Sequence, residues 1–201
     1  MLSLVLAFRE RPGENYLIPI DDEPMIRIVE ARLRMAKRID DIVTIVRKGE
    51  EKKFSLHVSN PLPVKARTRL EALLKALPPS GEVFLLEGNR PLVMPFLINY
   101  LSTLFLDSEA DALIPVWPKG EPEVFHAFYK ARALRSALEA MMADRERRPS
   151  ALIEYIDAET VDIGELSRRN TKVHLSFFRV RGSEDLRALR LLAKGKNIMS
   201  K

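Results

Sequence analysis

The chain has 201 residues, of which 46% are hydrophobic and 30% charged, a composition typical of a globular protein long enough for one domain with a sizeable core. The sequence contains no cysteine, which excludes disulfides, thiolate metal sites and a cysteine nucleophile, and no apolar run approaches the roughly 18 residues of a membrane span. The net charge of +5 is concentrated in residues 165–201, where ten Lys and Arg residues outnumber three Asp and Glu residues, a bias that suggests phosphate-bearing partners.

The apolar residues predict strands and helices that alternate along the first half of the chain. Pro24 suits the first turn of a helix, and Pro78 with Pro79 ends another because proline cannot continue it. The expected strands are 2–8, 41–46, 54–60 and 82–88, and the expected helices are 24–38, 65–77 and Pro95 to Leu106.

The second half continues the alternation. Strands are expected at 110–117 and 122–131, the latter leading into a helix at 132–148, whereas residues 150–164 are compatible with a strand or a helix end. The sequence KVHLSFFRV predicts a strand at 172–180. A last helix is expected from Ser183 to about Ala193, because a serine followed by acidic residues favours a helix start.

This order of elements, without repeats or an obvious linker, predicts a single domain over residues 1–201. Strand–helix alternation favours a three-layer α/β/α fold with a mostly parallel sheet. In such sheets ligands bind beyond the carboxyl ends of the strands. The rule selects the loop after Ala7, the turn after Leu86 and the turn after Phe178.

Two polar residues follow the strand at 82–88. Glu87 and Asn89 are two positions apart, so in a strand they point to the same side. Carboxylate and amide oxygens can hold a magnesium ion, which prefers oxygen ligands. The alternative is an ordinary turn in which Gly88 gives backbone freedom and Asn89 caps the backbone.

Two arginines lie at the end of the predicted strand 172–180. Arg179 and Arg181 would share a face of that strand, and two guanidiniums aimed at one place suit a polyphosphate. Alternatively they are surface arginines paired with Glu184 or Asp185.

The histidines offer no comparable site. His57, His126 and His174 lack partners at metal-ligand spacing, so no zinc site is expected. His126 lies between apolar residues and is expected to be packed and hydrogen bonded rather than catalytic.

The loop FRERPG after the first strand is a poor phosphate cradle. A glycine-rich loop binds phosphate because unobstructed backbone amides approach it closely. Here Phe8 would put bulk where the phosphate lies, and Pro12 removes an amide donor. Arg9 and Arg11 could bind phosphate, but glutamates in the same loop offset their charge.

The segments SLVLAF, FLLEGNRPLVMPFLINYL, VFHAFY and FFRVRGSEDLRAL, in this order and at these spacings, resemble the molybdenum cofactor guanylyltransferases (MobA-type proteins). That family has the GT-A-like, Rossmann-like nucleotidyltransferase fold and transfers GMP from Mg-GTP to the phosphate of molybdopterin, releasing pyrophosphate. The resemblance implies GTP and molybdopterin as substrates, Mg²⁺ as cofactor, and molybdoenzymes or other cofactor-synthesis proteins as further candidate partners.

The resemblance also assigns roles to residues, although many polar positions differ from the family pattern. Phe8 and Arg9 stand in the places of the loop glycines, Tyr16 is at or beside the place of the loop lysine, and Asn89 is in the place of the metal-binding aspartate. The segment at 60–64, the best match to the base-reading segment, contains no aspartate. The implied site comprises nucleotide contacts at Leu6, Ala7, Phe8, Arg9 and Tyr16, metal ligands at Asn89 and Glu87, and catalytic contacts at Arg179 and Arg181.

Two main hypotheses follow. The chain is a divergent guanylyltransferase, or it is a catalytically silent relative that binds a nucleotide, a pterin phosphate or a partner protein. A nucleic-acid accessory protein is a third, less favoured hypothesis, because aromatic residues do not alternate with the basic ones. With no basic leader and no membrane span, a cytoplasmic location is expected.

Overall fold

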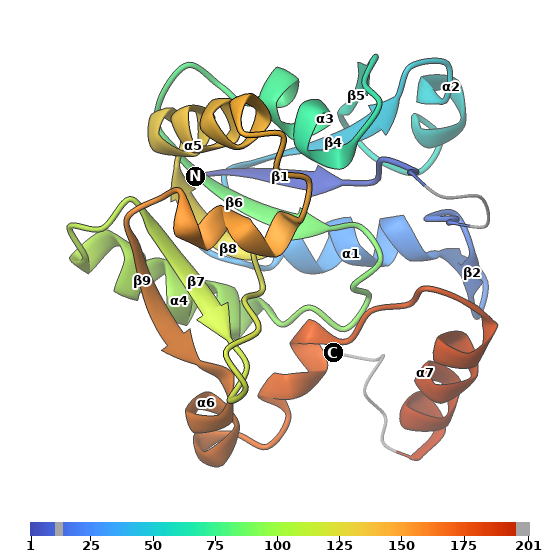
Figure 1. The fold of residues 1–201 in the computed structure, drawn as a ribbon. Helices are drawn as coiled ribbons and strands as arrows, with labels where there is room; N and C mark the ends of the chain where they lie inside the picture. The colour runs from blue at the N-terminus through green and yellow to red at the C-terminus, as the bar shows by residue number, and fades with distance from the viewer. Residues whose placement is uncertain (11–13, 196–201) are drawn as a thin grey trace.

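The computed structural model describes residues 1–10 and 14–195. Its centre is a seven-stranded sheet with the order β5-β4-β1-β6-β8-β7-β9 (Figure 1). In this sheet β8 runs antiparallel to β6 and β7, and the other neighbouring pairs are parallel. The strands are β1 (Leu2–Leu6), β4 (Asp41–Arg47), β5 (Pro61–Val64), β6 (Glu82–Glu87), β7 (Ala112–Val116), β8 (His126–Lys130) and β9 (Ala158–Asp162), and β2 (Pro19–Ile20) with β3 (Glu23–Pro24) forms a separate hairpin.

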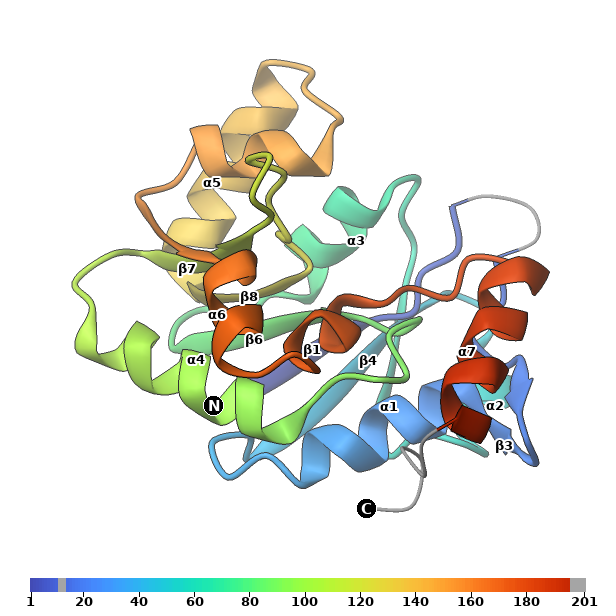
Figure 2. The ribbon, with the colours of Figure 1, turned by 90° about the horizontal axis from the view of Figure 1, so that it is seen from below.

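Helices cover both faces of the sheet. The helices α1 (Met25–Arg34) and α4 (Pro95–Asp107) lie on one face, and α3 (Arg69–Ala76) and α5 (Ala131–Ala143) lie on the other (Figures 1 and 2). The three-layer α/β/α fold with a mostly parallel sheet is therefore confirmed. The remaining helices are α2 (Glu51–Phe54), α6 (Ile163–Arg169), α7 (Ser183–Gly195) and the 3-10 helices η1 (Pro149–Glu154) and η2 (Val173–Phe177).

The side chains of β1 and of Ala7, the residue that follows it, explain how the sheet holds two cores. Leu4 and Leu6 belong to the core beneath α3 and α5, whereas Val5 and Ala7 belong to the core beneath α1 and α4. All four are buried, because successive residues of a strand point to opposite faces and helices cover both. A central parallel strand therefore reads as an uninterrupted apolar run.

The strand predicted at 54–60 is wrong. Residue 54 ends α2, and the strand that pairs with β4 on the side away from β1 is β5, which begins at Pro61. Proline cannot donate a hydrogen bond to a neighbouring strand, so a sequence containing Pro61 and Pro63 is unfavourable inside a sheet. It is tolerated here because β5 is an edge strand with one partner.

The strand predicted at 172–180 is also wrong. Residues Val173–Phe177 form the 3-10 helix η2, and no strand follows it before α7 within the described residues. The buried residues of η2 are packed against the core beneath α1 and α4 and include Val173, Leu175 and Phe177. Because these apolar residues occupy every second position, the sequence has the two-residue period of a strand although the backbone forms a 3-10 helix. The uncertain segment 150–164 forms η1, β9 and the start of α6.

The three predicted strand-end positions nevertheless come together. Leu6 is in register with Glu87, and the Gly88 amide donates to the Leu6 carbonyl at 3.0 Å. The segment after η2 joins them, because the Val180 amide donates to the Asn89 carbonyl at 2.9 Å. A Cβ on Gly88 would lie 2.6 Å from Ile26 Cδ1, so this glycine provides space for close packing.

Candidate functional site

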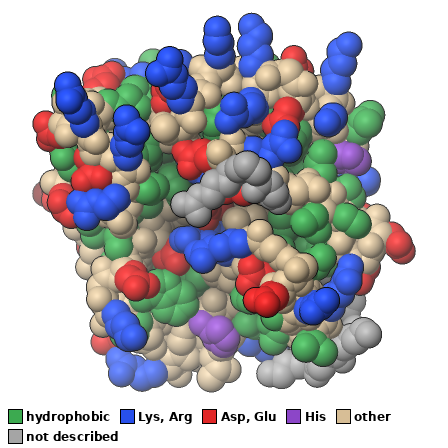
Figure 3. Space-filling model, turned by 45° about the vertical axis from the view of Figure 1, so that its right-hand side comes forward, with side chains coloured by type: hydrophobic (Ala, Val, Ile, Leu, Met, Phe, Trp, Pro, Cys, Tyr) green, Lys and Arg blue, Asp and Glu red, His purple; other side chains and the backbone are tan. Residues whose placement is uncertain are grey.

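A cleft of about 1360 Å³ opens beyond the carboxyl ends of β1 and β6; we call it the larger cleft. Its walls come from the loop after β1, the start of α3, the segment after η2 and the α5–η1 loop. Figure 3 shows Lys and Arg side chains along the upper part of the face at this edge of the molecule, on the side of α3 and α5. The charged residues that line the cleft are Arg67, Arg69, Arg145, Arg147, Arg179, Arg181, Glu10, Glu14, Glu71, Glu87 and Glu146.

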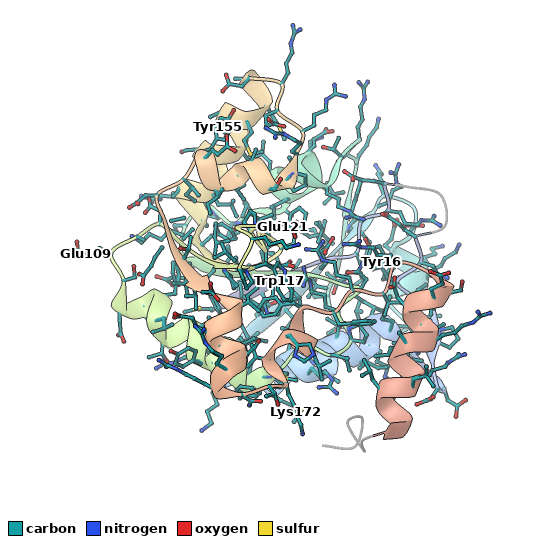
Figure 4. The ribbon with its side chains drawn as sticks, turned by 60° about the horizontal axis from the view of Figure 1, so that its bottom comes forward. Tyr16, Glu109, Trp117, Glu121, Tyr155 and Lys172 are labelled. Atoms are coloured by element: carbon teal, nitrogen blue, oxygen red, sulfur yellow. The ribbon has the colours of Figure 1, made fainter. Side chains whose placement is uncertain are left out.

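A second cleft of about 800 Å³, the smaller cleft, shares Arg179 and Arg181 with the larger one. Its walls include Trp117 and Phe177, whose rings meet edge to face with centroids 5.8 Å apart. Figure 4 shows Trp117 near the centre of the molecule and Tyr16, a residue of the larger cleft, to its right. Two clefts that meet at a pair of arginines can hold two anionic molecules next to each other.

Arg69 is the first residue of α3, and its guanidinium points into the larger cleft. Its Nη1 lies 3.0 Å from Glu87 Oε1, and one Nη2 hydrogen donates to Glu14 Oε1 at 2.5 Å. The same Nη2 is 3.3 Å from the Tyr16 hydroxyl, and Nε is 3.4 Å from the Phe8 carbonyl oxygen. Burial acts to lower the pKa of Arg69, but Tyr16, Glu87 and Glu14 raise it above its ordinary value, so the guanidinium is a permanent positive charge.

The local sequence explains the position of Arg69. Thr68 is the N-cap of α3, and its hydroxyl accepts a hydrogen bond from the Glu71 amide at 3.2 Å. The spacing Thr-x-x-Glu is a capping signal, and it fixes Arg69 in the first turn. The backbone amide of Arg69 donates to the Glu10 carboxylate, which joins the loop after β1 to the helix start.

A second group of charges lies behind Arg69. Arg90 is completely buried, pairs with Glu123, and donates from Nη1 to the Phe177 carbonyl at 2.9 Å. Arg179 also pairs with Glu123 and lies 3.1 Å from Glu87 Oε2. The pairs connect three segments, the turn after β6, the β7–β8 loop and the segment after η2. Buried charges require such mutual pairing, because an isolated one is strongly unfavourable.

Burial and pairing shift the pKa values of this group. Burial acts to raise the pKa of Glu123, but Arg90 and Arg179 lower it below its ordinary value. Burial, helped by the same two arginines, holds the pKa of His126 well below its usual range. His126 is packed, as expected, against Phe84 and Phe177. Neither ring nitrogen has a hydrogen-bond partner among the described residues, so the expected hydrogen bond is absent there.

Glu87 and Asn89 line the larger cleft, as predicted, but they do not fit a magnesium ion. Both oxygens of Glu87 are taken, Oε1 by Arg69 at 3.0 Å and Oε2 by Arg179 at 3.1 Å and Arg90 at 3.5 Å. Asn89 Oδ1 is buried without a partner among the described residues, yet one neutral oxygen is a weak ligand set for magnesium. No group of three His, Cys, Asp or Glu in the described part of the chain is placed to hold a metal.

The predicted nucleotide contacts divide into two groups. Tyr16 lines the larger cleft, and burial raises the pKa of its hydroxyl far above the ordinary value, so it is a neutral donor or acceptor. Leu6, Ala7 and Phe8 are fully buried in the two cores. Arg9 pairs with Glu50 instead of lining either cleft.

The expectation that the Phe8 ring occupies the phosphate position is wrong. The ring is in the core beneath α3 and α5, with the Arg47 guanidinium 4.9 Å from its centroid. The carbonyl of Phe8, rather than its side chain, is what approaches Arg69. Arg11 and Pro12, the other residues weighed in this loop, lie outside the described residues.

Arg179 and Arg181 line both clefts, although they are not on a strand. Arg179 pairs with Glu87 and Glu123, not with the acidic residues that begin α7. The Arg181 amide donates to Asp185 at 2.8 Å, but its guanidinium forms no ion pair within the described residues. Arg181 is therefore a positive charge available to a ligand.

Sequence reasoning missed Arg69, Arg90 and Glu123. The Thr-x-x-Glu capping signal at Thr68 could have placed Arg69 at a helix start, and Arg90 directly follows the predicted Glu87–Asn89 turn. Nothing in the local sequence indicates Glu123, whose two arginine partners are 33 and 56 residues away.

A family model of MobA-like NTP transferase domains matches residues 11–161. A protein of Thermococcus kodakarensis named "probable molybdenum cofactor guanylyltransferase" is 28% identical over 196 residues, 94% of each chain. One of Pyrococcus furiosus with the same name is 29% identical over 198 residues, 96% of this chain and 98% of that one.

Solved structures show the same fold. The molybdopterin-guanine dinucleotide biosynthesis protein A of Archaeoglobus fulgidus superimposes with a TM-score of 0.79 at 18% identity, covering 98% of this chain and 100% of that one. CMP:2-keto-3-deoxy-manno-octonic acid synthetase, solved with CTP, has a TM-score of 0.72 at 11% identity and covers 96% of this chain and 98% of that one. In the described part of the chain, no helix is both long and apolar enough to cross a membrane. The extent of the family match, over most of the sequence, shows that the chain belongs to the family of MobA-like NTP transferase domains.

Proposed function

We propose that this protein transfers GMP from GTP to the phosphate of molybdopterin, forming the guanine dinucleotide cofactor and releasing pyrophosphate. The named relatives support the reaction class and its substrates. The observation that carries the proposal is the pair of clefts that meet at Arg179 and Arg181. A transfer between two phosphate-bearing molecules needs such adjacent sites with positive charge at their boundary. A cytoplasmic location is part of the proposal.

The larger cleft is the proposed site of the nucleotide. It lies beyond the carboxyl ends of β1 and β6, where α/β proteins bind ligands, and the α3 N-terminus contributes a positive partial charge to it. Arg69, Arg179 and Arg181 supply guanidiniums for the phosphates. The smaller cleft is the proposed site of the pterin, which can lie against the rings of Trp117 and Phe177.

The proposed reaction is an in-line displacement at phosphorus. A phosphate oxygen of the acceptor forms a bond to the α-phosphorus of GTP, and the bond between that phosphorus and the oxygen bridging to the β-phosphate breaks. Pyrophosphate leaves with the bonding electron pair. Arg179 and Arg181 stabilise the negative charge that develops during the transfer, and no step depends on a magnesium ion held by Glu87 and Asn89. Of the predicted nucleotide contacts, we retain Tyr16 as a direct contact.

A catalytically silent relative is the second candidate. It is favoured by the loop after β1, where Phe8 and Arg9 stand in the glycine places and neither side chain lines a cleft. Arg69 is already paired with carboxylates of the chain itself. Such a protein would bind nucleotide or pterin phosphate without transferring GMP.

The two candidates are separated by measuring turnover and binding together. Pyrophosphate release is followed with molybdopterin and each of the four nucleoside triphosphates, and GTP and molybdopterin are titrated in a thermal-shift assay. Turnover with GTP supports the transferase. Stabilisation by either ligand without turnover supports the silent relative. The absence of both effects would rule out both proposals.

A further inference from the structure

The larger cleft contains more positive charge than the catalytic pair alone. The guanidiniums of Arg67, Arg145, Arg147 and Arg181 line it and form no ion pair or hydrogen bond within the described residues. These arginines come from three separate segments: the β5–α3 loop, the α5–η1 loop and the segment after η2. A metal-free triphosphate carries more negative charge than its magnesium complex, so it is the form that these arginines match better.

Contacts with the chain hold the Arg69 guanidinium in one position at the wall of the larger cleft. Its side chain is 15% exposed, and Glu87, Glu14, Tyr16 and the Phe8 carbonyl surround its three nitrogens. It needs no reorganisation to meet a phosphate at the open side of the cleft, and this preorganisation is what makes a fixed charge effective. These contacts take four of its five N–H groups and leave one Nη1 hydrogen to donate to a phosphate oxygen.

The same contacts work against a divalent cation. An ion bound to Glu87 would have to displace Arg69, Arg90 or Arg179 from its oxygens. It would also lie within a few ångströms of guanidiniums that repel it. Removing partners from a buried carboxylate–guanidinium group is unfavourable, since a buried charge would be left uncompensated.

We infer that Arg69, positioned by Glu87, is the resident cation of the nucleotide site, and that a nucleoside triphosphate binds in the larger cleft without a divalent cation. The inference rests on the proposed function, because it assumes that the larger cleft receives a nucleoside triphosphate. In this role Arg69 contacts the ligand, and Glu87 is a positioning residue.

The test is calorimetric titration of the full chain with GTP, once with EDTA and once with excess magnesium. The inference requires that affinity in EDTA equal or exceed affinity in magnesium. Tighter binding in magnesium than in EDTA would overturn the inference and leave the proposed function intact. No binding in either buffer would overturn the proposed function and the inference with it.

Two variants and a matched control test the role of Arg69 itself. Arg69→Met removes the charge but keeps an unbranched side chain, and it should weaken GTP binding in EDTA about 10- to 100-fold, the scale of charged hydrogen bonds. Its loss in magnesium should be smaller, because the carboxylates of Glu14 and Glu87 would then favour a divalent cation. Arg69→Lys should bind with intermediate affinity. Arg168→Met, at a residue 76% exposed on α6, should leave both affinities unchanged.

Folding of the variants is checked by circular dichroism. If Arg69→Met fails to fold, titration of the unaltered chain in the two buffers still decides whether GTP binds without a divalent cation. Equal losses for Arg69→Met in EDTA and in magnesium would contradict the assignment of Arg69 as the replacement for a metal.

Discussion

Glu123→Gln tests whether the buried charges form one connected unit. The side chain of Glu123 is 7% exposed and contacts three donors: Arg90, Arg179 and the Trp117 indole nitrogen, which donates at 2.8 Å. Glutamine has the same shape and keeps a neutral oxygen for the indole, so mainly the two ion pairs are lost. Glu87 remains as a partner for both arginines, at 3.5 and 3.1 Å.

The expected loss in the free energy of unfolding is about 2–4 kcal/mol. Breaking a buried pair costs about 3–5 kcal/mol, and the remaining contacts to Glu87 reduce that figure. Urea denaturation followed by circular dichroism measures the loss, with an unchanged m-value showing that the unfolded state is unaffected. Glu165→Gln is the control, since that carboxylate is 68% exposed and, among the described residues, pairs only with exposed Arg168, and it should change stability by less than about 0.5 kcal/mol.

The pH dependence gives an independent check on the same variant. A carboxylate whose folded-state pKa is lowered, as that of Glu123 is, stabilises the fold above its unfolded pKa of about 4.3, and this contribution is lost as the pH falls. The stability difference between the unaltered chain and Glu123→Gln should be constant above about pH 5 and should narrow below it. A loss smaller than about 1 kcal/mol with no narrowing in acid would refute the idea of desolvated, mutually dependent charges.

Three further variants address other parts of the molecule. His126→Phe should be neutral or stabilising at pH 7, because it removes two buried nitrogens that have no hydrogen-bond partner in the described part of the chain. Since the folded-state pKa of His126 is lowered, its contribution to stability falls as the pH drops below about 6.5; thermal melts between pH 5 and 8 should therefore show less acid destabilisation in the variant. Gly88→Ala should destabilise by about 1–3 kcal/mol, since its Cβ would lie 2.6 Å from Ile26 Cδ1, and Ile26→Val should relieve part of that loss in a double-mutant urea titration. Arg181→Met should weaken GTP binding about tenfold without moving the thermal midpoint, and an effect no larger than that of Arg168→Met would remove Arg181 from the site.

The strands that could be predicted from the sequence are those buried on both faces. β1, β4 and β6 read as continuous apolar runs because helices cover both sides of the sheet. The strand predictions at 54–60 and 172–180 are wrong because the local sequence pattern there does not match the backbone conformation. The prolines of β5 are tolerated only because the strand is at an edge, and the alternation in η2 comes from packing of a 3-10 helix against the core.

Some residues of the candidate site could be predicted from the sequence, but their contacts could not. Glu87, Asn89, Arg179 and Arg181 could be selected because polar residues directly after apolar runs mark the edge where ligands bind. What each side chain contacts could not be predicted. Arg69 and Glu87 are 18 residues apart in the sequence, and only the folded backbone brings their charges together.

The wall of the smaller cleft contains an intrinsic fluorophore, the indole of Trp117. The sequence contains one tryptophan, and its indole is held by Glu123 beside the ring of Phe177. When the protein is excited at the long-wavelength edge of the indole band, where its four tyrosines do not absorb, the emission therefore originates from a single known position. Quenching of this tryptophan fluorescence can therefore report the binding of an acceptor in the smaller cleft. Titrations with and without bound nucleotide would show whether the two substrates bind in a fixed order.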